Sequence, residues 1–262
     1  MESERLSYSI ISRFDVRFIE DLFSYDIVRK FYVLRSDHAQ SMSLFVDYMV
    51  TAHDNGISLI YKSSLRNGTP IGIIGGEVQQ DYNGDVAWNI AYAFLPEYWN
   101  RGYATEALIA FSNEIKQYTI PKAFLDISEE NTNSEKVAQK AGFLRIHNMA
   151  HIDPEHPELK VLFHWEKKLH SYRDYYFSIG VSAYKQKQYR EAENYFMQAL
   201  EEEYEGSPNT DALCYSNMGI ACSSYGNYEK AFQCLKKAQN LGLTNPSIEK
   251  ELLWLKINKG LG

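Results

Sequence analysis

The chain has 262 residues, of which 45% are hydrophobic and 14% aromatic, so it is long enough for one large globular domain or two ordinary ones. Its formal net charge of -7 argues against a broad surface for nucleic acid or an anionic membrane, because such surfaces need clustered lysine and arginine. No apolar run approaches the ~18 residues of a membrane span and residues 1–5 do not resemble a signal peptide, so we expect a cytoplasmic protein with no membrane partner.

The first 168 residues alternate between strand and helix patterns. Apolar residues at helical spacing predict helices, and apolar segments between glycine-bearing turns predict strands. The predicted helices cover residues 14–29, 36–53, 102–118 and 132–141, and the predicted strands cover residues 5–12, 57–63, 70–78, 86–94, 123–128, 143–150 and 160–168. This order predicts an α+β domain with a central sheet flanked by helices.

The stretch from Phe94 to Leu108 joins a predicted strand to a predicted helix through a glycine-bearing turn. Such a turn directs consecutive backbone N–H groups toward one point, and the helix adds the positive end of its dipole there. Small residues at Gly102 and Ala104 let an anion approach the backbone. The groups expected to meet the anion are the backbone N–H groups of Arg101, Gly102, Tyr103, Ala104 and Thr105. The alternative is an ordinary turn before an ordinary helix.

After Leu169 the strand patterns stop, and the rest of the chain has helical patterns only. An internal repeat occurs there at a constant offset of 39 residues (219 − 180), and its small residues let paired helices approach closely. The repeated set is Tyr176, Ile179, Gly180, Ala183, Tyr189, Ala192, Phe196 and Ala199, which recurs as Tyr215, Met218, Gly219, Cys222, Tyr228, Ala231, Leu235 and Ala238. A last helix from Asn245 to Lys259 is expected to cap the second repeat.

These patterns predict two domains, residues 1–169 and residues 170–262, the second being all-α with two repeats plus a capping helix. No glycine- or serine-rich linker separates Leu169 from Tyr172, which favours docked domains over tethered ones.

With this order of elements, residues 5–168 resemble the GNAT acetyltransferase superfamily, especially its ribosomal-protein N-acetyltransferase branch. The stretch from Phe94 to Ala107 resembles the acyl-CoA pyrophosphate loop of that family, and the segment Asn131-Thr-Asn-Ser134 together with Lys140-Ala-Gly-Phe143 resembles its second motif. Residues 171–262 resemble tetratricopeptide repeats. The resemblance implies a GNAT-like mixed central sheet followed by a tetratricopeptide-like helical domain.

The resemblance also implies acetyl-CoA as co-substrate. It implies that the backbone of Phe94 and Leu95 pairs with the pantetheine arm, that residues 100–105 hold the pyrophosphate, and that Asn131 hydrogen-bonds the arm. Ser134 is also expected among the residues that bind acetyl-CoA.

Two positions depart from the family pattern. Trp99 stands where the family often has Gln or Arg, and Ala138 stands where many members have a tyrosine acid. A serine at position 134 is typical of the branch that lacks this tyrosine.

Amide formation requires a neutral amine, so a base or a water relay must remove a proton. Asp126 is the first candidate, because it precedes Asn131 by five residues, where some protein-acetylating members carry a base glutamate. Strand alternation puts it on the same face as Phe124 and Ser128. Glu77 is the second candidate. The alternative for either is a solvated or substrate-orienting carboxylate.

Other steps of the reaction need hydrogen-bond donors. The backbone N–H of Leu95 is expected to form the oxyanion hole. Ser134 is expected to donate to the leaving sulfur, and its alternative role is to help cap a helix. Arg101, Lys136 and Lys140 either meet the nucleotide phosphates or are ordinary exposed cations.

The seven histidines do not predict a metal site. His147 and His151 are four residues apart in or beside a strand, a spacing that does not form one compact ligand face. Trp88 and Tyr92 share a strand face, where they line an acceptor pocket or belong to the core.

We therefore expect an acetyl-CoA-dependent N-acetyltransferase that acts on a primary amine. The leading acceptor is a protein or peptide N-terminus or lysine, recruited by the repeat domain. One alternative is a small amine such as an amino sugar or an aminoglycoside. The other is a non-catalytic binding or adaptor protein that uses the repeat domain.

Overall fold

A computed structural model describes residues 1–262 except residues 33, 35, 153–160 and 203–208. The chain divides into two compact units, Met1–Leu169 and His170–Gly262. In the part of the chain that is described, no helix is long and apolar enough to cross a membrane.

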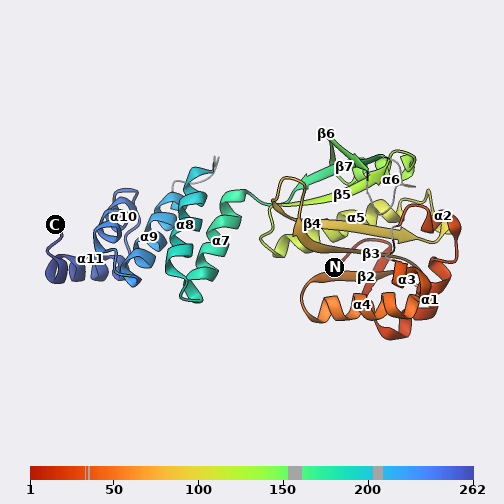
Figure 1. The fold of residues 1–262 in the computed structure, drawn as a ribbon, viewed down its shortest axis with the longest axis horizontal. Helices are drawn as coiled ribbons and strands as arrows, with labels where there is room; N and C mark the ends of the chain where they lie inside the picture. The colour runs from red at the N-terminus through yellow and green to blue at the C-terminus, as the bar shows by residue number, and fades with distance from the viewer. Residues whose placement is uncertain (33, 35, 153–160, 203–208) are drawn as a thin grey trace. The chain divides into compact units, whose positions relative to one another are not determined.

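A seven-stranded mixed sheet forms the centre of the first unit (Figure 1). Its strand order is β1-β2-β3-β4-β5-β7-β6, and every neighbouring pair is antiparallel except β4 and β5, which are parallel. The strands are β1 (Leu6–Ile10), β2 (Ser58–Leu65), β3 (Pro70–Gln80), β4 (Val86–Phe94), β5 (Lys122–Ser128), β6 (Leu144–Ile152) and β7 (Val161–Lys168). The predicted α+β class, with its mixed central sheet, is confirmed.

Helices cover both faces of this sheet. They are α1 (Val16–Leu22), α2 (Asp26–Arg29), α3 (Ser36–Gln40), α4 (Met42–Asp54), α5 (Tyr103–Glu114) and α6 (Thr132–Lys140). Because residues of a strand alternate between faces, Trp88 and Phe94 pack in the core with α5, whereas Ala93 and Leu95 pack in a second core with α1 and α4.

Serine side chains divide two of the predicted helices. The helix predicted over residues 14–29 is interrupted after α1, where the hydroxyl of Ser24 donates to the carbonyl of Asp21 (2.7 Å). The helix predicted over residues 36–53 is interrupted at Ser41, whose side chain accepts a backbone N–H of α4 as its N-cap. A serine that bonds the nearby backbone competes with helical hydrogen bonds, and apolar spacing alone does not reveal this.

Strands β4 and β5 diverge after a short paired segment. Their parallel pairing covers three residue pairs, from Ala87 with Lys122 to Asn89 with Phe124. Beyond this point β4 continues to pair with β3 as far as Phe94, and β5 continues with β7 as far as Ser128. The two strands therefore open a gap in the sheet next to the start of α5 and α6.

The second unit consists of paired helices. They are α7 (Tyr172–Lys185), α8 (Tyr189–Glu201), α9 (Asn209–Ser224), α10 (Tyr228–Asn240) and α11 (Pro246–Lys259). A methyl group at Gly180 would lie 2.8 Å from the ring of Phe196, and one at Gly219 would lie 2.7 Å from the side chain of Leu235. The repeated glycines thus allow a close approach within each helix pair.

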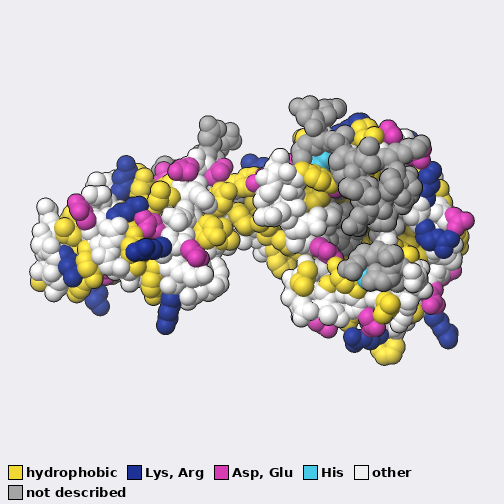
Figure 2. All heavy atoms as spheres, viewed as in Figure 1, with side chains coloured by type: hydrophobic (Ala, Val, Ile, Leu, Met, Phe, Trp, Pro, Cys, Tyr) yellow, Lys and Arg dark blue, Asp and Glu magenta, His cyan; other side chains and the backbone are white. Residues whose placement is uncertain are grey.

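Charged side chains of both signs are interspersed on the face of the second unit that Figure 2 shows. The cysteines Cys214, Cys222 and Cys234 are all buried and free.

Candidate active site

The loop between β4 and α5 presents a row of backbone N–H groups. Two of its residues have left-handed backbone angles, Asn100 with φ 59° and Gly102 with φ 81°, and Gly102 is the N-cap of α5. For the N–H groups of residues 100–105, no acceptor is found in the part of the chain that the structure describes. Unpaired amides at a helix N-terminus attract an anion, so the geometry fits the phosphate-binding role expected for this loop.

A cavity of about 520 Å³ lies beside this loop. Its lining includes most residues expected to hold the co-substrate: Phe94, Asn100, Gly102, Tyr103, Ala104, Thr105, Asn131 and Ser134. Tyr92, Trp99, Lys136 and Lys140 also line it, whereas Leu95 and Arg101 do not. The cavity thus joins the loop, the end of β4 and the start of α6 across the gap in the sheet, and the two lysines add positive charge for phosphates.

Asn131 and Ser134 meet at the start of α6. Asn131 is the N-cap, and its Oδ1 accepts the backbone N–H of Ser134 at 3.1 Å. The side-chain NH₂ of Asn131 has no partner among the described residues, so it is available to donate to a carbonyl in the cavity.

Tyr92 enters this cavity from β4, and its hydroxyl donates to the backbone carbonyl of Ser134 at 3.5 Å. Burial raises the pKa of Tyr92 to about 12, against a lowering effect of its contact with Ser134. The hydroxyl is therefore a hydrogen-bond donor at neutral pH. Trp88, on the same strand face, is a core residue that is 3% exposed.

The expectation that Leu95 supplies the oxyanion hole is wrong for this geometry. Its N–H donates to the carbonyl of Ile71 on the side of β3 (2.9 Å), and its carbonyl accepts the N–H of Tyr98 (3.0 Å). Neighbouring residues of a strand direct their N–H groups to opposite sides, so the N–H of Phe94 is the one on the side of the gap. The carbonyl of Phe94 accepts the indole N–H of Trp99 at 2.7 Å.

Arg5, which the sequence patterns do not single out, supports the loop from the N-terminal segment. Its Nη1 donates to the carbonyl of Arg101 (3.0 Å), and its guanidinium lies over the ring of Tyr103 (4.6 Å). Its backbone N–H and Nε both donate to the carboxylate of Glu106, at 2.6 Å and 2.7 Å. Burial raises the pKa of Glu106, but hydrogen bonds from Arg5 and Ser3, with the charge of Arg5, outweigh burial and hold that pKa below its ordinary value.

The two candidate bases lie on the face of the sheet opposite α5. Glu77, Asn89 and Phe124 are in register across β3, β4 and β5, and Asp126 is the next residue on this face of β5, beyond the last pair with β4. The hydroxyl of Tyr48 donates to Oε1 of Glu77 at 2.6 Å. Neither carboxylate lines the 520 Å³ cavity.

Asp126 belongs to a hydrogen-bonded cluster. The hydroxyl of Tyr82 donates to its Oδ2 (2.8 Å), and Nδ1 of His164 lies 2.8 Å from its Oδ1. His164 pairs with Asp126 across β5 and β7. Knowledge of this strand register would have identified His164 as a neighbour of the candidate base. The two histidines singled out in the sequence were His147 and His151. The structure does not describe their side chains.

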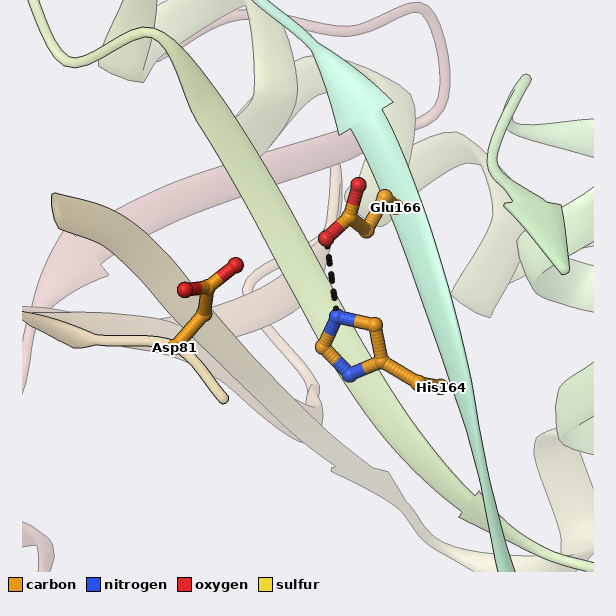
Figure 3. Close-up of side chains that lie close together, drawn as sticks. All are labelled: Asp81, His164 and Glu166. Atoms are coloured by element: carbon orange, nitrogen blue, oxygen red, sulfur yellow. Dashed lines mark hydrogen bonds and ion pairs between the residues drawn. The ribbon is translucent and has the colours of Figure 1, made fainter. Parts of the chain in front are cut away.

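Asp81, His164 and Glu166 lie close enough together to suggest a metal site (Figure 3). However, the ammonium of Lys122 already lies among the carboxylates, 2.5 Å from Asp81 and 3.2 Å from both Asp85 and Glu166. A metal ion would have to displace this buried cation, so we interpret the cluster as an ion-pair network.

Comparison with known protein families gives two matches. The family described as "Acetyltransferase (GNAT) domain" matches residues 13–144, and "Tetratricopeptide repeat" matches residues 175–242. These ranges lie within the two parts of the chain for which a resemblance was noted, and both resemblances are confirmed. The comparison with curated proteins found no match.

Solved structures with a similar fold cover the first unit. A GNAT-family acetyltransferase from Bacillus anthracis is 21% identical, with a TM-score of 0.53 over 64% of this chain and 98% of that chain. Ribosomal-protein-S5-alanine acetyltransferase from Vibrio fischeri is 15% identical, with a TM-score of 0.53 over 64% and 95%. The aminoglycoside acetyltransferase AAC(6')-Ib is 15% identical, with a TM-score of 0.51 over 63% and 94%.

Proposed function

The chain belongs to the GNAT acetyltransferase family, and from this premise we propose that it acetylates a primary amine of a protein or peptide. Its reaction is acetyl-CoA-dependent N-acetylation, with acetyl-CoA as the co-substrate. The observation that carries the assignment of the site is the row of unpaired N–H groups over residues 100–105, beside a cavity that the end of β4 and the start of α6 also line.

In the proposed site, the loop over residues 100–105 binds the pyrophosphate, and Lys136 and Lys140 neutralise further phosphate charge. The side-chain NH₂ of Asn131 donates to the pantetheine arm. The N–H of Phe94, on the gap side of β4, takes the place of Leu95 as donor to the thioester oxygen.

The acceptor amine attacks the thioester carbon from the face that carries Asp126 and Glu77. As the C–N bond forms and the C–S bond breaks, the nitrogen loses a proton to Asp126, directly or through water, and the sulfur leaves as a thiolate. The thiol conjugate to the leaving group has a pKa near that of cysteine, ~8.5, so the thiolate leaves without much help. Donors such as Ser134 or Tyr92 therefore accelerate the reaction less than the base does.

Support for a protein or peptide acceptor comes from the second unit. Its helix pairs match a tetratricopeptide repeat, and repeat arrays of this kind commonly bind peptides. We propose that this unit recruits the protein substrate or another protein partner. A small cationic amine remains the competing acceptor, since carboxylates on the acceptor face attract any ammonium group.

A thiol-release assay with a panel of amines tests the proposal. The panel contains a peptide with a free N-terminus, its N-terminally blocked counterpart with one lysine, spermidine and an aminoglycoside. We expect turnover with a peptide at lower concentration than with either small amine. Preference for a small amine would identify that class as the acceptor, and no turnover with any amine would favour a binding or adaptor role.

A chain that ends at Leu169 separates recruitment from chemistry. If the second unit recruits the substrate, the shortened chain keeps acetyl-CoA binding and small-amine turnover but loses peptide turnover. If it is soluble and acetylates every acceptor as the full chain does, the recruitment proposal fails.

A further inference from the structure

His164 is a fully buried histidine whose two ring nitrogens both face carboxylates. Its side chain is 0% exposed, its Nδ1 lies 2.8 Å from Oδ1 of Asp126, and its Nε2 lies 3.0 Å from Oε1 of Glu166. Ionised carboxylates only accept hydrogen bonds, so each nitrogen must carry a proton to make both contacts. Both contacts are therefore hydrogen bonds only when the ring is an imidazolium.

The charges around His164 agree with this state. Burial lowers the pKa of His164, but the hydrogen bond and charge of Asp126, followed by those of Glu166, outweigh burial and raise this pKa above its ordinary value. Lys122 is shared between Glu166 and the turn that joins β3 to β4, so a second cation lies beside Glu166. Of the described groups, those that face this network are Asp126 and Lys122 on β5, Glu166 on β7, and Asp81, Tyr82 and Asp85 on the β3–β4 turn.

The turn that carries Tyr82 is itself held rigidly. Oδ1 of Asp81 accepts the N–H groups of Asn83 and Asp85, both at 2.9 Å, and Oδ2 of Asp81 pairs with Lys122 at 2.5 Å. The ring of Tyr82 packs edge-on against His164, with 5.2 Å between the ring centroids. The two groups that hold Asp126 therefore also contact each other.

We propose that His164 is a positioning residue for the acceptor amine: as a buried imidazolium it holds Oδ1 of Asp126, so that Oδ2 and the hydroxyl of Tyr82 face the amine. This inference rests on the proposed function, in which Asp126 meets the acceptor. The side chain of Asp126 is 18% exposed, whereas that of His164 is fully buried, so the substrate reaches the carboxylate and not the imidazole. His164 therefore acts only through Asp126.

The protonation state is tested first, by NMR titration of the histidine rings in the full chain, with His164→Gln used to assign the signal. We expect His164 to be doubly protonated at pH 7 and to lose its proton only above the ordinary histidine value of about 6.5. Glu166→Gln should lower the pH at which His164 titrates. Titration of His164 at about 6.5 or below in the wild type overturns the inference.

The positioning role is tested by kinetics with the best amine acceptor of the panel. His164→Gln should lower kcat at least about 10-fold with little change in the KM for acetyl-CoA, because the carboxylate loses its fixed orientation. His53→Gln, at the far end of α4, is the matched control and should keep wild-type kinetics. The double variant, His164→Gln with Asp126→Asn, should have a kcat no lower than that of Asp126→Asn alone, since the two residues act as one unit.

The outcomes distinguish this inference from the proposed function. A double variant that loses the full product of both single effects overturns the inference while leaving the acetyltransferase assignment intact. A cationic His164 in a chain that acetylates no amine overturns the proposed function, and with it the role given to His164.

Discussion

Arg5 and Glu106 lie 101 positions apart in the sequence, and Nε of Arg5 is 2.7 Å from Oε2 of Glu106. The same arginine donates to the carbonyl of Arg101 and lies over the ring of Tyr103. The N-terminal segment thereby supports the loop that we assign to the pyrophosphate from within the protein. Preorganisation of this kind lowers the entropic cost of binding.

Glu106→Gln should therefore weaken acetyl-CoA binding, although residue 106 is not expected to contact the co-substrate. The substituted side chain keeps its size but loses the charge that holds Arg5, and Arg5 is partly exposed, so we expect a loss of roughly 3- to 10-fold in affinity. Calorimetric titration of acetyl-CoA measures this loss. Arg13→Ala, which breaks an exposed ion pair with Asp47, is the control and should leave the affinity unchanged. Equal affinity for Glu106→Gln and wild type would mean that the loop does not need this support.

The stability that His164 contributes should depend on pH in a defined direction. Because the folded-state pKa of His164 is raised, its contribution is fully present below the ordinary value of about 6.5 and is lost as pH rises through the raised pKa. The difference in unfolding free energy between wild type and His164→Gln, measured by denaturant titration, should shrink with rising pH. A difference that stays constant across this range would show that the charge of His164 does not stabilise the fold.

Asp126→Asn should lower turnover by ~10²-fold or more at neutral pH, and by less at high pH, where free amine is already abundant. The carboxamide keeps the size of the side chain but cannot take a proton. Asp85→Asn, in the same network but paired with Lys122, serves as the control. Initial rates across the pH range distinguish the roles, because an equal loss at every pH would point to binding or folding instead of proton removal.

In the second unit, Gly219→Val should destabilise the α9–α10 pair. Even a methyl group at this position would lie 2.7 Å from Leu235, and overpacking of a close contact typically costs about 1 to 3 kcal/mol. Thermal unfolding should show this loss, while acetyl-CoA affinity stays at the wild-type value. Gln233→Val, at an exposed position of α10, controls for the helix propensity of valine. Equal loss in both variants would mean that propensity, and not helix contact, accounts for the effect.

The parts of the site that could be predicted from the sequence depend on local geometry. A left-handed glycine before a helix, as at Gly102, determines the direction of the neighbouring N–H groups whatever the rest of the fold does. Asn131 and Ser134 were expected from the resemblance of residues 131–134 to the second motif of the family, and the structure shows that they are the N-cap of α6 and a residue of its first turn.

The residues that the sequence did not reveal depend on strand order. His164 meets Asp126 only because β7 pairs with β5 in one register, and Arg5 reaches Glu106 across the fold. Leu95 was misassigned because the side to which a strand N–H points is decided by which neighbour it bonds, here Ile71 on β3.

Calorimetric titration of acetyl-CoA into the Gly102→Glu variant tests the central assignment most directly. The glutamate adds bulk and negative charge where the loop N–H groups are to meet the pyrophosphate. Gly68→Glu makes the same change at a remote turn of similar backbone angle, φ 88° against 81°, with nothing within 4 Å. We predict that Gly68→Glu binds acetyl-CoA as the wild type does and that Gly102→Glu, folded by circular dichroism, shows no binding. Wild-type affinity in a folded Gly102→Glu variant would contradict the assignment of this loop to the pyrophosphate.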